Sequence, residues 1–462
     1  MSYNFALCLD LATLITCCIA FVKLADLRHS HPAVIYVAFH AYAFTSRLIA
    51  LAFGALPLFA QANYAGQFEV VRETEIGSAI AIADLALACF TAGTVIASRN
   101  PPSAAKIRQQ LLTPRIIWAV AAIAIPLGVY GAFLTSRIPG SEGLSSFALL
   151  SDWKDSSWVQ ILAAWPGLML LALIYYYGPR LVFMVPLSLF LLLMLYQGYH
   201  RFRVIIPVIA IMQIYLDRKD RRWPGPVMLV ALVAFGFTFF SMKTVGRMMQ
   251  KGASTEELVR VVQEGTQSAT HGDADDQKFL DELACVITGI DRSGEYALGQ
   301  TYYSLLTLPI PRKFWPEKPS PADYLDLVSS SGRPFKQLGM IVTLPGEAYA
   351  NFGYLGVIGL PFFFALWLTR QYQHAYRRDR LSVNRFIYVL AAANLIQTYR
   401  DGLAGLFVLV TVDMMPLVII VIAHRWLRFA DLSSRRGLVG IAATPAASTG
   451  VGSSQLGSQQ RR

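Results

Sequence analysis

Two short apolar stretches in this 462-residue sequence are bordered by arginines. The first, residues 204–216, follows Arg201 and Arg203, and the second, residues 386–399, is followed at once by Arg400. The 13 residues of the first stretch make a helix about 20 Å long, whereas the hydrocarbon core of a bilayer is about 30 Å thick. We therefore expect both helices to draw their arginines below the headgroups on one side of the membrane.

Arginine at this depth usually faces the interior of the bundle and marks a functional site. The planar guanidinium group matches phosphate oxygens, so a lipid diphosphate at headgroup level would offset the desolvation of Arg201, Arg203 and Arg400. The alternative is that Arg201 and Arg203 extend to ordinary lipid phosphates while Arg400 pairs with Asp401. Because the pattern recurs in two helices, we favour the diphosphate site.

A polar segment at residues 247–352 interrupts the apolar runs, and its second half interleaves cations with aromatic rings. Rings stack on sugar faces and cations bind phosphate or uronic acids, so this composition suits a glycolipid. A plain interfacial belt would have a similar composition. The interleaved residues are Arg292, Tyr302, Tyr303, Arg312, Lys313, Trp315, Lys318, Tyr324, Arg333 and Lys336.

Glu347 is the one carboxylate where this segment meets the next apolar run. A partly desolvated glutamate has a raised pKa and can take a proton from a sugar hydroxyl, as glycosyl transfer to an acceptor requires. Alternatively, Glu347 hydrogen-bonds the acceptor or pairs with an arginine of the segment.

The sequence predicts neither a metal site nor a cofactor. His271, Asp273, Asp275 and Asp276 stand in HGDADD, whose spacing resembles the DxD element of some glycosyltransferases. Acidic residues just before a helix at 278–283 are better explained by capping or a solvated turn. The five cysteines have no CxxC or Cys/His spacing.

Other ionisable residues within the predicted membrane helices include Asp10, His40, Arg47, Asp84 and Asp413. Arg47 and Asp84 lie on consecutive helices at comparable depth, which favours a buried ion pair that locks the bundle. A proton relay is the alternative, which the single histidine disfavours.

The amino-acid composition indicates a membrane protein, so the depth of each polar residue in the bilayer matters for its role. Apolar residues make up 55% of the chain and charged residues 15%, with a mean hydropathy of +0.46, against roughly 25% charged residues in soluble proteins. These values exclude an ordinary soluble enzyme, a disordered chain, a coiled coil and a disulfide scaffold. The net charge of +11 then reflects the side of the membrane on which basic residues lie, and no nucleic-acid partner is expected.

The expected fold class is an all-α polytopic membrane protein with about eleven transmembrane helices. The predicted spans are residues 4–22, 33–58, 77–97, 115–135, 158–176, 181–198, 203–216, 226–246, 353–370, 385–399 and 404–424. They divide the chain into an N-terminal bundle of about eight helices (1–246), a large periplasmic loop (247–352), about three C-terminal helices (353–424) and a cytoplasmic, disordered tail (425–462). Within the loop, Ser254 followed by Glu256 and Glu257 predicts a helix start.

Cytoplasmic loops collect Lys and Arg, so the short connections predict the orientation. Residues 99–115, 218–222 and 370–385, and the region after Arg425, are rich in them. We therefore expect a bacterial inner-membrane protein with a periplasmic N-terminus and a cytoplasmic C-terminus. The first helix carries Asp10 and no basic segment precedes it, so we expect it to be retained instead of cleaved.

The segments GQTYYSLLTLPIPRKFWPEKP (299–319) and LPGEAYANFGYLGVIG (344–359) resemble the Wzy-type O-antigen and oligosaccharide repeat unit polymerases. The similarity lies in an I-P-R-x-x-W-P-x-K-P element followed by G-E-x-Y-x-N-F-G-x-x-G at the start of a helix. An upstream short helix that opens with YHRFR is similar too.

The resemblance implies a metal-independent glycosyltransferase with the architecture of lipid-dependent (GT-C-like) enzymes. Its donor and acceptor would be undecaprenyl-diphosphate-linked oligosaccharides, with a chain-length regulator and a flippase as partners. Glu347 would activate the acceptor hydroxyl. The expected ligands of the departing diphosphate are Arg201, Arg203, Arg312 and Arg400. The other expected substrate contacts are Arg292, Trp315, Lys318 and Tyr349.

Other activities fit parts of the pattern. An O-antigen ligase takes the same donor with a lipid A core acceptor, but the W-P-x-K-P and G-E-x-Y elements favour a polymerase. A glycolipid flippase or exporter component usually has repeated halves, and the sequence has no internal repeat. A membrane scaffold would leave the arginines unexplained.

Overall fold

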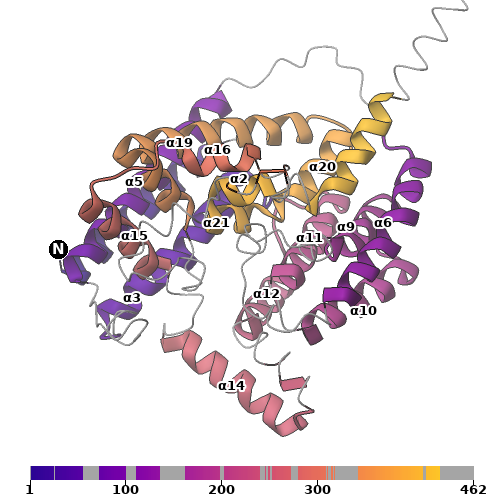
Figure 1. Cartoon of the computed structure of the whole chain (residues 1–462), viewed down its shortest axis with the longest axis horizontal. Helices are drawn as coiled ribbons and strands as arrows, with labels where there is room; N and C mark the ends of the chain where they lie inside the picture. Colours follow the sequence, from indigo (N-terminus) through magenta and orange to yellow (C-terminus); the bar gives the residue numbers. More distant parts are fainter. Residues whose placement is uncertain are drawn as a thin grey trace, which may run out of the picture.

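The protein is helical in the part of the chain that the structure describes. This computed structural model describes residues 2–24, 27–55, 72–99, 111–135, 162–197, 202–239, 245, 248–249, 252–271, 279–307, 310, 314–315, 317, 342–408 and 413–426. These residues contain no strand, as the all-α prediction requires (Figure 1). Five helices among them are long and apolar enough to cross a membrane.

The five are α1 (Tyr3–Val22), the continuous run of α2 (Pro32–His40), the π-helix η1 (Ala41–Thr45) and α3 (Ser46–Ala52), then α5 (Glu73–Arg99), α6 (Pro114–Thr135) and α19 (Leu344–Tyr376). Shorter apolar helices are α9 (Trp165–Tyr177), α10 (Leu181–Gln197), α12 (Pro226–Phe239), α20 (Val383–Ala392) and Met415–Trp426. The remaining helices are α11 (Phe202–Arg218), α14 (Thr255–His271), α15 (Phe279–Ser293), α16 (Gln300–Thr307) and α21 (Leu395–Val408). The number of eleven spans stays a prediction, because five of the described helices have the required length.

The predicted boundary between the last two helices is wrong. Residues 385–399 were expected to form one helix, but α20 and α21 are separated by a turn at Asn394. The side-chain Nδ2 of Asn394 donates to the carbonyl of Leu390 at 3.1 Å. A local bond from a side chain to the backbone of this kind competes with continuation of the helix. Arg400 therefore lies inside α21 instead of beyond a helix end.

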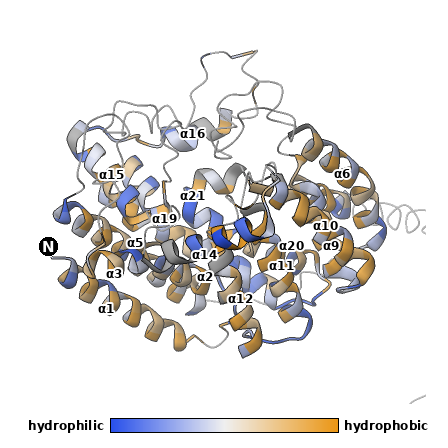
Figure 2. Cartoon of the chain, turned by 90° about the horizontal axis from the view of Figure 1, so that it is seen from below, coloured by the Kyte–Doolittle hydropathy of each residue, from blue (hydrophilic) through white to orange (hydrophobic). Residues whose placement is uncertain are grey.

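The N-terminal helix α1 has the burial pattern of a helix at the edge of a membrane bundle, with one face against the protein and the other exposed. Its buried residues are Ala6, Asp10, Leu14, Cys17 and Phe21. The opposite face exposes large apolar side chains, including Ile15 at 59% and Ile19 at 54%, and Figure 2 shows α1 orange along most of its length. Such a face would be a liability in water, whereas the bilayer core solvates it.

Two large hydrophobic cores hold most of the described helices together. The first joins α1, α2, α3, α5, α15, α19, α20 and α21 around Tyr36, Phe90 and Tyr399. The second joins α6, α9, α10, α11, α20 and the helix Met415–Trp426. Helices α5 and α19 lie side by side (Figure 1). Gly93 permits this approach, because a Cβ at that position would collide with the carbonyl oxygen of Phe362.

Several connections that carry basic residues meet at one end of the bundle, which we call the basic end. It comprises Arg28–His31, the end of α5, the α11–α12 turn and residues 373–385. The contacts that join these segments include Arg28 to Asp220 (2.9 Å), Arg385 to Asp217 (2.7 Å), Gln373 Nε2 to the carbonyl of Ala97 (3.3 Å) and Tyr376 to Ser30 (2.6 Å). The connections 218–222 and 370–385, both predicted to be cytoplasmic, thus lie at the same end, and the side of the membrane that this end faces stays a prediction.

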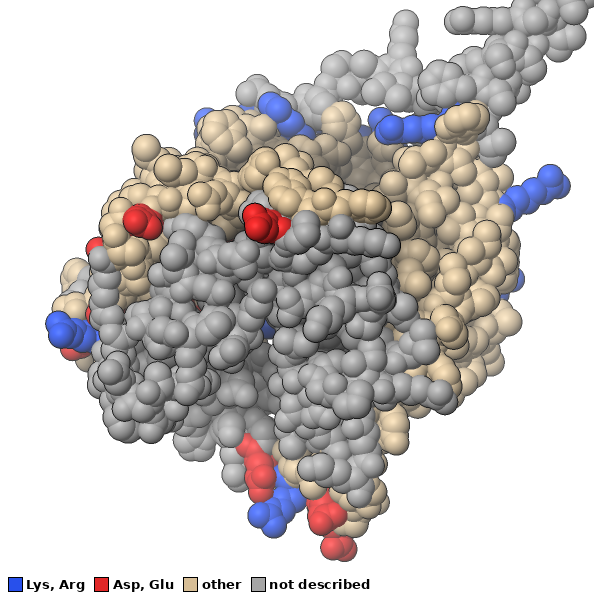
Figure 3. Space-filling model, in the orientation of Figure 1, with Lys and Arg blue, Asp and Glu red and all other residues tan. Residues whose placement is uncertain are grey.

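Helix α14 begins where the sequence predicted a helix start. The Ser254 amide donates to Glu257 Oε2 at 2.7 Å and the Glu257 amide donates to Ser254 Oγ at 3.3 Å, which makes a capping box. Further along α14, Arg260 binds Glu264 at 2.8 Å. Figure 3 shows acidic and basic side chains together at the lower end of the molecule, where Figure 1 places this helix.

Candidate functional site

The G-E-x-Y-x-N-F-G-x-x-G segment forms a broken helix end in α19. Phe352 and Gly353 leave helical geometry, with Gly353 at φ +59°. The chain folds back so closely that a Cβ at Gly356 would collide with the carbonyl oxygen of Ala348. The turn frees the carbonyls of residues 350 and 351, which accept hydrogen bonds from the amides of residues 297 and 298 at 2.9 and 3.0 Å.

The side chain of Glu347 reaches a second broken helix, α21. Gly402 interrupts α21 at φ +79°, and the Leu403 amide that follows donates to Glu347 Oε2 at 2.5 Å. A Cβ on Gly402 would collide with this carboxylate. Glu347 is 3% exposed, so an acidic group is buried at the amino end of a half-helix, where the helix dipole stabilises negative charge.

Asn351 fixes α16 against the first half of α19. Its Oδ1 accepts from the Gly299 amide at 3.1 Å, and its Nδ2 donates to Thr301 Oγ1 and to the carbonyl of Glu347, both at 2.8 Å. This network holds α16 beside Glu347.

Tyr302 on α16 is a site residue that the sequence identified only as one aromatic among many. Its ring stacks on Phe352 with the centroids 6.5 Å apart. Burial, reinforced by the negative charge of Glu347, raises the pKa of Tyr302, so its phenol keeps its proton. The hydroxyl is buried, and the nearby Asn351 side chain partly offsets the rise in its pKa. No signal in the sequence separates Tyr302 from Tyr303.

Tyr349, predicted to contact substrate, has protein partners. Its hydroxyl donates to Asp291 Oδ1 at 2.7 Å, and its ring packs edge-on against Tyr296 at 6.2 Å. Tyr296 in turn lies against Gly353, where a Cβ would be 3.1 Å from its ring. These contacts position the break in α19.

Arg400 lies on α21, two residues before the glycine that breaks this helix. Its Nη1 donates to Asp401 Oδ1 at 3.0 Å, so the pairing weighed as an alternative is present. The Arg400 side chain is 19% exposed, and its Nε is buried.

The other predicted site residues are described in part. Arg201, Arg312 and Lys318 lie outside the described residues, as do Asp273, Asp275 and Asp276. Arg203 stands in the first turn of α11 and Arg292 in the last turn of α15, without a described side chain, and Trp315 is partly buried. The convergence of Arg201 and Arg203 with Arg400 stays a prediction.

The predicted Arg47–Asp84 ion pair is wrong. Arg47 binds Asp281 of α15, with Nε to Oδ2 at 2.7 Å and Nη2 to Oδ1 at 3.3 Å. The sequence analysis placed Asp281 in an extramembrane loop, but α15 packs its apolar face into the first core and brings this carboxylate to α3. Asp84 contacts His40 instead.

Comparisons of the chain with protein-family models, curated proteins and solved structures found no match.

Proposed function

We propose that this protein is a bacterial polysaccharide polymerase that joins undecaprenyl-diphosphate-linked oligosaccharide repeat units at the periplasmic face of the inner membrane. The observation that carries the proposal is the buried carboxylate of Glu347, which joins two broken helices and accepts from the Leu403 amide, three residues after Arg400 on α21. The second half of α19 runs from this site to Tyr376 at the basic end, about 33 Å at 1.5 Å per residue. A cytoplasmic basic end would therefore put Glu347 near the opposite, periplasmic headgroups.

The residues of the site suit the transfer of a glycan. Glu347 would accept the proton of an acceptor hydroxyl, whose oxygen then bonds to the anomeric carbon of the donor. The bond between that carbon and the lipid diphosphate breaks, and the diphosphate leaves with the electron pair. Arg400 would stabilise the charge on the departing group, and the phenol of Tyr302 would donate to a sugar oxygen.

The genetic test is to delete the gene in its host and to separate the lipid-linked and surface glycans on a gel. The proposal predicts loss of the high-mass ladder while the single-repeat glycolipid is retained. Loss of all surface glycan with accumulation of lipid-linked polymer would contradict it and identify a ligase or an exporter. An unchanged ladder would exclude all three.

A further inference from the structure

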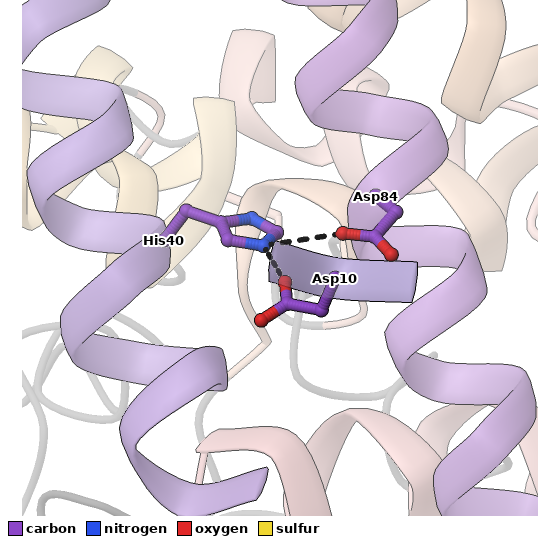
Figure 4. A group of neighbouring side chains, drawn as sticks. All are labelled: Asp10, His40 and Asp84. Atoms are coloured by element: carbon purple, nitrogen blue, oxygen red, sulfur yellow. Dashed lines mark hydrogen bonds and ion pairs between the residues drawn. The ribbon is translucent and has the colours of Figure 1, made fainter. Parts of the chain in front are cut away.

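A second cluster of ionisable groups lies in the middle of the first three long helices, apart from Glu347 (Figure 4). Asp10 comes from α1, His40 from the end of α2 and Asp84 from α5. His40 Nε2 lies 2.8 Å from Asp10 Oδ1 and 3.4 Å from Asp84 Oδ1. Asp10 and His40 are fully buried and Asp84 is 6% exposed. The proposed polymerase chemistry uses none of the three.

The charges of this cluster are unbalanced. Two carboxylates meet one ring nitrogen, which carries at most one hydrogen and cannot donate fully to both. In the described part of the chain, three carboxylate oxygens have no hydrogen-bond partner: both oxygens of Asp84 and Oδ2 of Asp10. Figure 4 nevertheless shows both carboxylates turned toward the ring of His40. Even a protonated imidazole leaves one net negative charge. Buried charge of this kind is costly unless a cation neutralises it.

We propose that Asp10, His40 and Asp84 bind one divalent transition-metal ion of the zinc or manganese class. One imidazole nitrogen and two carboxylate oxygens are donors that such ions accept, and with a divalent ion the site is neutral. At metal–ligand distances of about 2.1 Å, neighbouring donors of a tetrahedral site are about 3.4 Å apart. One donor from each residue already lies within 4.8 Å of the others, so small side-chain movements complete the site.

The backbone beside His40 supports a binding role. The π-helix η1 starts at Ala41, directly after His40, and interrupts an otherwise α-helical span. Single π turns inside helices are rare and frequently occur at functional sites. The bound ion would link α1, α2 and α5, which also pack together in the first core.

The outer shell of the site sets the expected affinity. A metal-binding histidine normally donates its second ring N–H, but His40 Nδ1 has no partner among the described residues. We therefore expect the ion to bind about 10- to 100-fold more weakly than at a site with a complete outer shell.

The test uses the full-length protein in detergent, stripped of metal and equilibrated with Zn²⁺ or Mn²⁺. Metal content after gel filtration and the thermal midpoint are measured for the wild type, His40→Ala and Asp84→Asn. We expect one ion for each wild-type chain and a raised midpoint, with both effects lost in the two variants. Asp217→Asn is the matched control, because it removes a buried carboxylate that binds Arg385 and should keep the metal.

A wild-type protein that binds no metal and unfolds at the same temperature with and without it would overturn the proposal and assign the cluster to a shared proton. Equal metal content in His40→Ala would overturn it as well. If the variants do not fold, the visible spectrum of the wild type with Co²⁺ decides. Bands of a tetrahedral nitrogen and oxygen site support the proposal, and their absence contradicts it.

Discussion

The two ends of the bundle use arginine in different ways. At the basic end, Arg385 binds the buried carboxylate of Asp217 at 2.7 Å and lies over the ring of Tyr376 at 4.6 Å. At the other end, Arg400 binds its sequence neighbour Asp401 at 3.0 Å, and both side chains are partly exposed. Arg385 joins two helices through a carboxylate that is fully buried, whereas the Arg400–Asp401 pair lies within one helix.

The two ends also differ in how regular their helices are. Helices at the basic end finish in ordinary turns and caps, such as the Ser382 hydroxyl that accepts from the Arg385 amide at 3.3 Å. At the other end α19 and α21 are interrupted at Gly353 and Gly402, both with positive φ. Helical geometry is therefore interrupted on both helices that position Glu347. Unusual backbone conformations of this kind cluster at functional sites. The basic end therefore joins the helices through buried polar contacts, and under the proposed function the opposite end binds the glycolipid.

The largest predicted effect on stability is at the basic end. Arg385→Ala leaves the Asp217 carboxylate buried without its main partner, which should lower the free energy of unfolding by about 3–5 kcal/mol. Denaturation in mixed micelles measures this change. Polymerisation by each folded molecule should be unchanged, and Arg385→Met combined with Asp217→Leu should regain stability. A specific loss of turnover at wild-type stability would contradict the division between the ends.

Arg400→Ala should have the opposite profile. Removing one group that stabilises developing charge typically lowers turnover about 100- to 1,000-fold. The pair with Asp401 is partly exposed and lies within one helix, so the loss of stability should be smaller than for Arg385→Ala. Synthesis of high-mass glycan in membranes measures the effect. Arg260→Ala on the exposed face of α14 is the control and should leave synthesis intact. Full-length glycan from Arg400→Ala would remove this residue from the site.

The sequence predicted the all-helical class, which the described residues confirm, because hydropathy reports on it directly. The orientation of the bundle and the role of Glu347 stay predictions. The sequence could not predict that Asp281 enters the first core or that Tyr302 lies beside Glu347. Those contacts depend on how distant helices pack. Arg47 was misassigned for the same reason, since depth along a helix does not say which partner approaches from another segment.

Gly402→Ala tests the break in α21 and should lower the free energy of unfolding less than Arg385→Ala does. A residue with a Cβ that adopts the positive φ of Gly402 destabilises the fold by about 1–3 kcal/mol. The new methyl group would also push the Glu347 carboxylate away from the Leu403 amide. We expect reduced stability together with loss of polymerisation. Gly236→Ala in α12 has no atom within 4 Å of the added Cβ and serves as the control. Equal behaviour of the two variants would show that the break in α21 is not required.

Acid should weaken the basic end through His31, the N-cap of α2. Burial lowers the pKa of His31 from 6.5 to about 3, and its Nδ1 accepts from the Ala33 amide at 3.2 Å, which requires the neutral ring. The unfolded chain takes up the proton first, so this stability is present above pH 6.5 and is lost as the pH falls toward 3, at about 1.4 kcal/mol for each pH unit. His31→Asn keeps a capping oxygen and should flatten the dependence of the thermal midpoint on pH. An unchanged slope would show that His31 is not the group responsible.

The most direct test of the central claim is Glu347→Gln, assayed for unfolding temperature and for glycan polymerisation in the same membranes. The amide oxygen of glutamine can still accept from the Leu403 amide, so the cap on the second half of α21 is kept while the proton acceptor is lost. The account predicts a wild-type unfolding temperature and a loss of polymerisation of about 100-fold or more. High-mass glycan at the wild-type level would contradict it and leave Glu347 as a helix cap alone.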